Sequence, residues 1–117
     1  MTTEIIASRT GDVLTLTLNR PEALNAITPA MVAGMNARLD EAETDGTRVV
    51  VLTGAGRGFC AGADLLAVGE DPVGSTKFLA DLQALLVRIA AYPMPVIAAV
   101  NGTAMGGGTE LILAADF

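Results

Sequence analysis

Two glycine-rich segments contain the residues best suited to chemistry in this sequence. One runs from Gly54 to Asp64 and the other from Gly102 to Glu110, and each follows a short apolar run that is typical of a buried strand. Loops at strand ends are where α/β proteins bind ligands. A glycine leaves its own N–H open to a ligand because it has no Cβ. These two segments therefore indicate a site that binds its ligand through backbone amides.

The second segment also pairs backbone donors with an acid. Gly106, Gly107 and Gly108 precede an expected helix, whose first N–H groups lack intrahelical acceptors and carry partial positive charge. Such an N–H can stabilise an oxyanion that develops on a substrate carbonyl. Glu110, in the first turn, is the best candidate for a general acid or base. The alternative is structural: the glycines serve close packing and Glu110 interacts with the helix dipole.

Other interpretations of these loops fail on spacing. A dinucleotide-binding G-x-G-x-x-G motif needs a glycine where Phe59 stands, and the second segment lacks the lysine of a P-loop. The only serines, Ser8 and Ser75, do not lie in a nucleophile elbow. Cys60 is predicted to be a small buried side chain rather than a nucleophile. The remaining assignments are Asp64 and Asp116 as capping or turn residues, Met31 and Met35 as core, and Met105 as a pocket wall.

Composition narrows the class of protein. The chain has 117 residues, 51% of them hydrophobic, which fits one folded domain or part of one. It has no histidine and one cysteine, which excludes histidine-based triads, an internal disulfide and a Cys/His zinc site, and fits a reducing compartment. A net charge of −6 disfavours nucleic acid. No signal peptide or membrane span is evident, so we expect a soluble cytoplasmic protein.

The elements that must position these loops follow from periodicity and turn signals. Alternation in Val13–Leu18 predicts a strand with one face on the core, and Thr28-Pro29 predicts a helix start. Their order favours α/β layers in one unit. The expected elements are strands at 4–8, 13–18, 48–53 and 96–100, the second pair buried on both faces, and helices at 29–43, 75–91 (with Leu79, Leu82, Leu85, Leu86 and Ile89 on its apolar face) and 109–115.

Four motifs together resemble those of a known family. They are Asn19–Ala26, Val51–Leu65, Pro95–Gly102 and Gly106–Glu110, and they span nearly the whole chain. In order and separation they are similar to the crotonase superfamily, also called enoyl-CoA hydratase/isomerase. The resemblance implies a crotonase-like (ClpP/crotonase) α/β fold, a spiral of strand-strand-helix units that binds a coenzyme A thioester. Coenzyme A would be part of the substrate, with no separate cofactor and no metal.

The resemblance also implies roles for individual residues. The N–H groups of Ala63 and Gly107 match the pair that holds the thioester oxygen, and Glu110 matches the first of two glutamates that hold and activate water. The assigned coenzyme A-binding positions are Ala23, Leu24, Ala61, Asp64 and Leu65, with Met105 and Gly106 beside them.

Family domains are longer, so residues 1–117 are expected to be the N-terminal part of a single crotonase-like domain whose spiral is incomplete here. The second glutamate has no counterpart, and this polypeptide alone is expected to be inactive or nearly so. The leading hypothesis is an enoyl-CoA hydratase, a homo-oligomer (trimer or hexamer) when complete. The alternatives are isomerisation, thioester hydrolysis or decarboxylation of an acyl-CoA, or a non-catalytic coenzyme A-binding piece.

Overall fold

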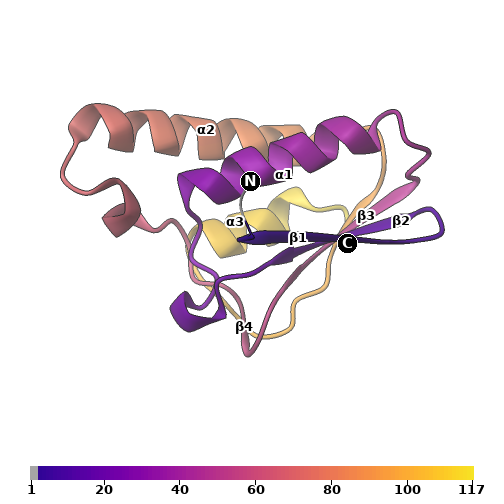
Figure 1. Cartoon of the computed structure of the whole chain (residues 1–117), viewed down its shortest axis with the longest axis horizontal. Coiled ribbons are helices and arrows are strands. Elements are labelled where there is room, and N and C mark those ends of the chain that lie inside the picture. Colours follow the sequence, from indigo (N-terminus) through magenta and orange to yellow (C-terminus); the bar gives the residue numbers. More distant parts are fainter. Residues whose placement is uncertain (1–2) are drawn as a thin grey trace.

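A sheet covered by helices on one face forms the main body of the molecule (Figure 1). The computed structural model describes residues 3–117. The outer strand β1 is antiparallel to β2, and the other strands are parallel. The strands of this sheet, in spatial order, are β1 (Ile5–Thr10), β2 (Val13–Leu18), β3 (Val49–Gly54) and β5 (Val96–Ala98).

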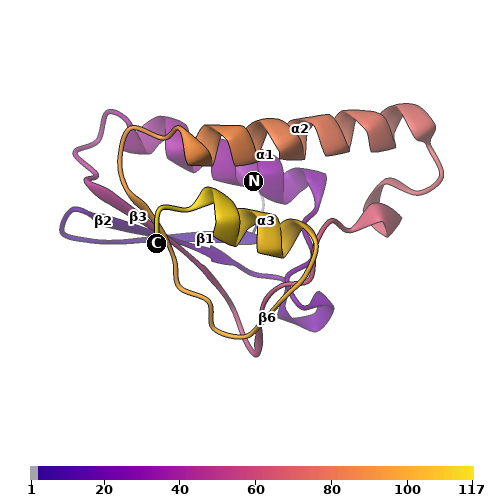
Figure 2. The ribbon, with the colours of Figure 1, turned by 180° about the vertical axis from the view of Figure 1, so that it is seen from behind.

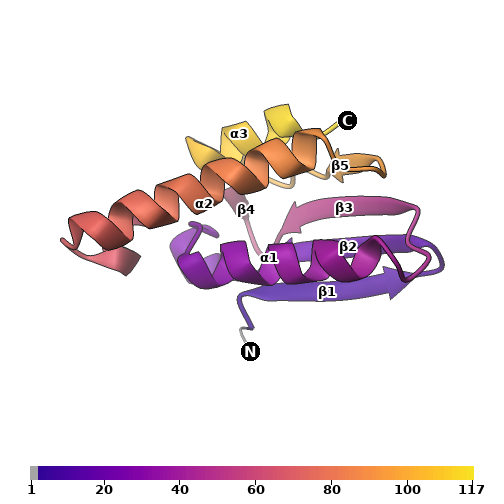
Figure 3. The same ribbon diagram turned by 90° about the horizontal axis from the view of Figure 1, so that it is seen from above.

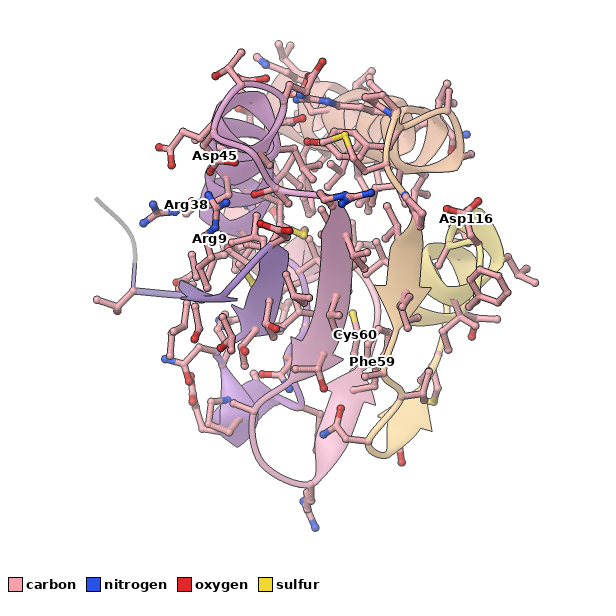
Figure 4. The ribbon with its side chains drawn as sticks, turned by 90° about the vertical axis from the view of Figure 1, so that its right-hand side faces the viewer. Arg9, Arg38, Asp45, Phe59, Cys60 and Asp116 are labelled. Carbon is pink, nitrogen blue, oxygen red and sulfur yellow. The ribbon has the colours of Figure 1, made fainter. Side chains whose placement is uncertain are left out.

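Helices α1 and α2 lie side by side over one face of this sheet, and α3 lies beyond its edge strand β5 (Figure 3 and Figure 4). The central helix α2 packs against α1 on one side and α3 on the other. The α-helices are α1 (Pro29–Ala42), α2 (Pro72–Ala90) and α3 (Gly107–Ala114), and the short 3₁₀ helices are η1 (Pro21–Ala23) and η2 (Leu65–Val68). The predicted strands and α-helices occur in the predicted order, and the described residues form two further short strands between them.

A second, two-stranded sheet lies at the lower end of the molecule, below α3 (Figure 2). It pairs β4 (Gly58–Cys60) with β6 (Thr103–Ala104) in parallel. Both segments were expected to be loops. Two or three residues between glycines are too short to show the alternation that marks a strand, so the pairing became visible only in three dimensions.

The alternation in β2 has the predicted effect. Leu14, Leu16 and Leu18 are buried under the helices, while Thr15 and Thr17 are only half-buried on the other face. The central strand β3 repeats this pattern, so the prediction that it is buried on both faces is wrong, and the same holds for β5. The reason is that the helices of the described chain cover only one face of the sheet.

Helix α1 begins and packs as predicted. The hydroxyl of Thr28 accepts a hydrogen bond from Met31 N at 3.1 Å, and proline occupies the first helical position, where its missing N–H costs nothing. Met31, Met35 and Leu39 are buried against the sheet. Their spacing of four residues places them on one face of the helix.

Helix α2 differs from its prediction in its start and its apolar face. It begins at Pro72 rather than Ser75, because the carboxylate of Asp71 caps it by accepting from Val73 N. Phe78 is buried, while Leu79 is 46% exposed. Phe78 lies four residues before Leu82 and so belongs to the buried stripe, whereas Leu79, one residue further round the helix, faces away from that stripe. The first turns of α2 extend past the end of the sheet (Figure 1).

Interior packing continues from the main sheet into β4. Phe59 and Cys60 are fully buried, near the point where the main sheet gives way to the second sheet (Figure 4). Within residues 3–117, no helix combines the length and apolar character needed to cross a membrane.

Candidate active site

The pairing of β4 with β6 brings the two glycine-rich segments together. Beyond the paired residues, Met105 N donates to Cys60 O at 3.0 Å. The backbone of Gly108 lies even closer to Cys60, because a Cβ at Gly108 would collide with the carbonyl of Cys60. Only glycine permits this approach. Two stretches 40 residues apart in sequence, around 60–64 and 104–108, therefore share one small region.

The N–H of Ala63 points into this region without a partner. Ala63 forms a single parallel bridge with Ile27, in which Ile27 N donates to Gly62 O at 2.7 Å and Asp64 N donates to Ile27 O at 2.8 Å. Successive peptide groups of an extended chain point to opposite sides, so the N–H of Ala63 faces away from Ile27. No described residue accepts a hydrogen bond from it.

The N–H of Gly107, the first residue of α3, has no acceptor either within residues 3–117. Its neighbours are used, since Gly108 N donates to Met105 O and Glu110 N to Gly106 O. Ala63 N lies only 3.6 Å from the point where a Cβ on Gly107 would stand. The two unpaired amides are therefore adjacent, at the end of α3 that carries partial positive charge. This arrangement can bind a carbonyl oxygen and stabilise negative charge on it.

Glu110 lies three residues after Gly107, on the same side of α3. It is exposed. It also lines an open groove of about 280 Å³ between α2 and α3, whose other residues are Gln83, Leu86, Val87, Ala90, Leu113 and Ala114. The acid is thus close to the amide pair in sequence but not enclosed by the described chain.

The carboxylate of Asp64 is committed to the protein itself. It accepts from Leu66 N at 3.1 Å, which caps η2, and pairs with Arg20 at 3.0 Å. The prediction of a capping residue is confirmed. Its assignment to coenzyme A binding stays a prediction, and any such contact must compete with Arg20.

The other assigned coenzyme A positions fall into two groups. Leu24 and Ala61 lie together, because Ala61 N donates to Leu24 O at 2.9 Å, and Ala23 ends the short helix η1 just before them. Leu65, at the start of η2, and Met105 are both about half exposed. Gly106 lies between Met105 and the amide of Gly107 with a positive φ of 51°. The role of Met105 as a pocket wall stays a prediction.

Two asparagines that the sequence interpretation passed over hold the turn between β3 and β4. Asn25, fully buried with a φ of 58°, donates to Ala55 O and Gly58 O and accepts from Arg20 N. Asn101 donates to Gly56 O and Gly58 O from the other side and accepts from Gly54 N. The available signal was that both lie inside the family-like motifs and that asparagine tolerates left-handed backbone.

The remaining candidates behave structurally. Cys60 is buried, and burial raises the pKa of its thiol, which is unfavourable for a nucleophile. Asp116 accepts from Val96 N and thereby holds the end of the chain to β5 (Figure 4). Among residues 3–117, no three cysteine or acidic side chains gather in a way that could bind a metal ion.

Comparison with known proteins assigns the chain to a family. The enoyl-CoA hydratase/isomerase family model matches residues 8–117. The chain is 47% identical over 110 residues to 1,2-epoxyphenylacetyl-CoA isomerase of Escherichia coli, covering 89% of this chain and 42% of that enzyme. It is 45% identical over 115 residues to 2,3-dehydroadipyl-CoA hydratase of the same organism, covering 97% of this chain and 44% of the hydratase.

Solved structures agree on the fold. A crystal structure of enoyl-CoA hydratase from Bacillus anthracis superposes with a TM-score of 0.91 at 39% identity, over 98% of this chain and 46% of that one. This chain thus spans less than half the length of these relatives. The predicted crotonase-like α/β fold is confirmed over the part that is shared. The chain belongs to the enoyl-CoA hydratase/isomerase family.

Proposed function

We propose that this chain is the N-terminal part of a single crotonase-like domain that adds water across the 2,3 double bond of an enoyl-CoA thioester. The observation that supports the proposal best is the adjacent pair of unpaired amides at Ala63 and Gly107, with Glu110 three residues further on. The coenzyme A moiety belongs to the substrate, and the reaction needs no separate cofactor or metal.

The amide pair acts on the thioester oxygen. When both N–H groups donate to this oxygen, they withdraw electron density from the conjugated carbon C3, so that a water oxygen can add there. The negative charge moves onto the thioester oxygen as an enolate, where the two donors and the positive end of α3 stabilise it. Each donor contributes roughly 3 kcal/mol to the transition state.

Glu110 acts as the general base. A carboxylate beside the amide pair can hold the water and accept its proton as the new C–O bond forms. The enolate then takes up a proton at C2 from a second acid, which the family resemblance assigns to another glutamate. For this reason the 117-residue polypeptide alone is expected to hydrate crotonyl-CoA slowly or not at all, and rapid turnover by it would contradict the mechanism.

A second candidate is isomerisation of an acyl-CoA, because the family name includes isomerases of enoyl-CoA and one relative, 47% identical, is an isomerase of an epoxyacyl-CoA. The amide pair serves that reaction equally well, since it also passes through charge on the thioester oxygen. Hydrolysis and decarboxylation share the same requirement. Product analysis separates these: hydration of crotonyl-CoA yields a 3-hydroxyacyl-CoA, whereas isomerisation moves the double bond.

The assembly and location of the protein belong to the same proposal. A homo-oligomer, trimer or hexamer, is expected for the full-length protein and can be measured by light scattering. A cytoplasmic location is supported by the free thiol of Cys60 in the interior. Neither nucleic acid nor a membrane is proposed as a partner.

The deciding experiment removes one donor from the full-length protein. Gly107→Pro deletes the N–H at a helix position where proline is well tolerated, and kcat for crotonyl-CoA hydration should fall by about 10²–10³. Gly107→Ala is the matched control, because it keeps the N–H and its Cβ makes ordinary contacts at 3.6 Å. Wild-type activity in Gly107→Pro would remove the Gly107 N–H from the mechanism. Calorimetric binding of an acyl-CoA without turnover by the wild type would instead support a non-catalytic binding protein.

A further inference from the structure

The guanidinium of Arg20 contacts the residue that follows Ala63 in the chain. Its Nη1 donates to the carbonyl of Ala26 at 2.7 Å and to the carboxylate of Asp64 at 3.0 Å. Both charged side chains are largely buried, with 19% of Arg20 and 18% of Asp64 exposed. A charge pair with this little solvent contact is screened far less than one on the surface.

The two acceptors of Arg20 flank the bridge that orients Ala63. Ala26 precedes Ile27 and Asp64 follows Ala63, and Ile27 and Ala63 are the two residues of the isolated bridge. One nitrogen thus ties together the two short stretches whose pairing turns the N–H of Ala63 away from Ile27. Three backbone hydrogen bonds join the same two stretches, from Ala61 N to Leu24 O and the two of the bridge itself. Arg20 adds a charged side-chain link on both sides of the bridge, to the residue before Ile27 and the residue after Ala63.

Arg20 is itself anchored on a second side. Its Nε lies 4.0 Å from a carboxylate oxygen of Glu4, and the other oxygen of Glu4 accepts from the hydroxyl of Thr28. The same hydroxyl caps α1 through Met31 N. The guanidinium is therefore fixed to the start of α1 on one side and to the loop of Ala63 on the other.

We propose that Arg20 is a positioning residue which, through Ala26 and Asp64, sets the direction of the Ala63 N–H toward the thioester oxygen. The proposal rests on the function proposed above and adds the side chains that orient one of its two amides. Lysine cannot replace arginine here, because an ammonium is a compact point charge without the planar, multi-donor geometry of a guanidinium. Asp64 acts through its hydrogen bonds to Arg20 rather than by touching the reacting atoms.

The test uses the full-length protein with variants Arg20→Lys and Asp64→Asn. The asparagine keeps an oxygen that can cap η2 but loses the charge. The matched control is Arg88→Lys, since Arg88 is also a partly buried arginine that pairs with two carboxylates, Asp40 and Glu43, but at the far contact between α1 and α2. Misplacement of a catalytic group by about 1 Å costs up to 10²-fold in rate.

We expect kcat to fall by about 10–100-fold in both site variants, with KM nearly unchanged, and to stay at the wild-type value in Arg88→Lys. The infrared stretch of the thioester carbonyl in bound butyryl-CoA, which binds without reacting, should move toward its frequency in free solution in the site variants alone. Arg20→Lys combined with Asp64→Asn should cost no more than the larger single change, because the two residues act as one unit.

Unchanged kcat and carbonyl frequency in folded Arg20→Lys would overturn the proposal. It would also be overturned if only Asp64→Asn had an effect and that effect were a loss of coenzyme A affinity. Circular dichroism establishes folding, and if Arg20→Lys does not fold, Asp64→Asn decides by the same two readouts. Failure of the proposed function itself would look different, because the wild-type protein would then neither turn over crotonyl-CoA nor shift the carbonyl frequency.

Discussion

Two regions of the molecule are held together by different means. In the helical layer, which we define as the main sheet with α1 and α2, the interior consists of aliphatic and sulfur-containing side chains together with the aromatic ring of Phe78. In the loop layer, residues 19–27, 54–66 and 101–107, side chains of arginine, asparagine and aspartate bond to backbone carbonyls and amides. Apolar burial therefore dominates in the helical layer, whereas hydrogen bonds from polar side chains shape the backbone of the loop layer.

The largest effect is expected from a cavity in the helical layer. Leu85 is 1% exposed and Leu79 is 46% exposed on the same helix. Leu85→Ala should lower the free energy of unfolding by about 2–4 kcal/mol, and Leu79→Ala by less than about 0.5 kcal/mol. Urea denaturation of both variants measures the difference. Equal losses would mean that Leu79 packs as the sequence pattern first suggested.

The next effect falls on the close approach between α3 and the loop layer. Gly108→Ala forces a Cβ against the backbone of Cys60, which cannot move as a side chain end could, and should cost about 1–3 kcal/mol of stability. Gly107→Ala, one residue away, meets its neighbours at 3.6 Å and should be nearly neutral. Thermal denaturation of the two variants would refute the packing described here if Gly108→Ala were as stable as Gly107→Ala.

A buried asparagine tests whether polar side chains hold the loop layer. Asn25→Ala leaves the carbonyls of Ala55 and Gly58 without this donor and should destabilise the protein by about 1–3 kcal/mol. Asn36→Ala, on α1, is the control, because alanine is favoured in helices and Arg88 keeps its two carboxylate partners there. The comparison fails if both variants unfold at the same urea concentration.

The smallest effect is a pH dependence at the junction of the two regions. Burial raises the pKa of the Cys60 thiol above its ordinary value of 9.0. The unfolded chain therefore loses its proton first, so stability is full below pH 9.0 and falls as pH rises through the folded pKa. Burial also raises the pKa of Tyr92, which adds to the same trend. Cys60→Ala should flatten, without abolishing, the decline in urea midpoint at alkaline pH, and an unchanged slope would contradict this.

The sequence predicted the helical layer better than the loop layer for a physical reason. Leu14, Leu16 and Leu18 show a period of two, and Thr28-Pro29 marks a helix start, because these local patterns reflect burial and capping directly. The one-sided burial of β3 was missed, since continuous apolar runs look alike whether one or both faces are covered. Phe78 displaced Leu79 because the register of a helix face depends on what lies beneath it.

The residues of the candidate site could be predicted from the sequence, but the contacts that hold them in place could not. Family-like motifs identified Ala63, Gly107 and Glu110, and helix-end physics pointed to the amide of Gly107 alone. The pairing of β4 with β6 and the contact from Arg20 to Asp64 join residues 44 to 45 positions apart, which no local pattern encodes. Contacts of this kind become visible only in the three-dimensional structure.

In the proposed function, the amides of Ala63 and Gly107 together bind the thioester oxygen of an acyl-CoA. The most direct test is a crystal structure of the full-length protein with bound butyryl-CoA. We predict the thioester oxygen at roughly 2.7–3.1 Å from both nitrogens. An ordered thioester whose oxygen lies away from this pair, or amides that have turned to bond with the protein, would contradict the account.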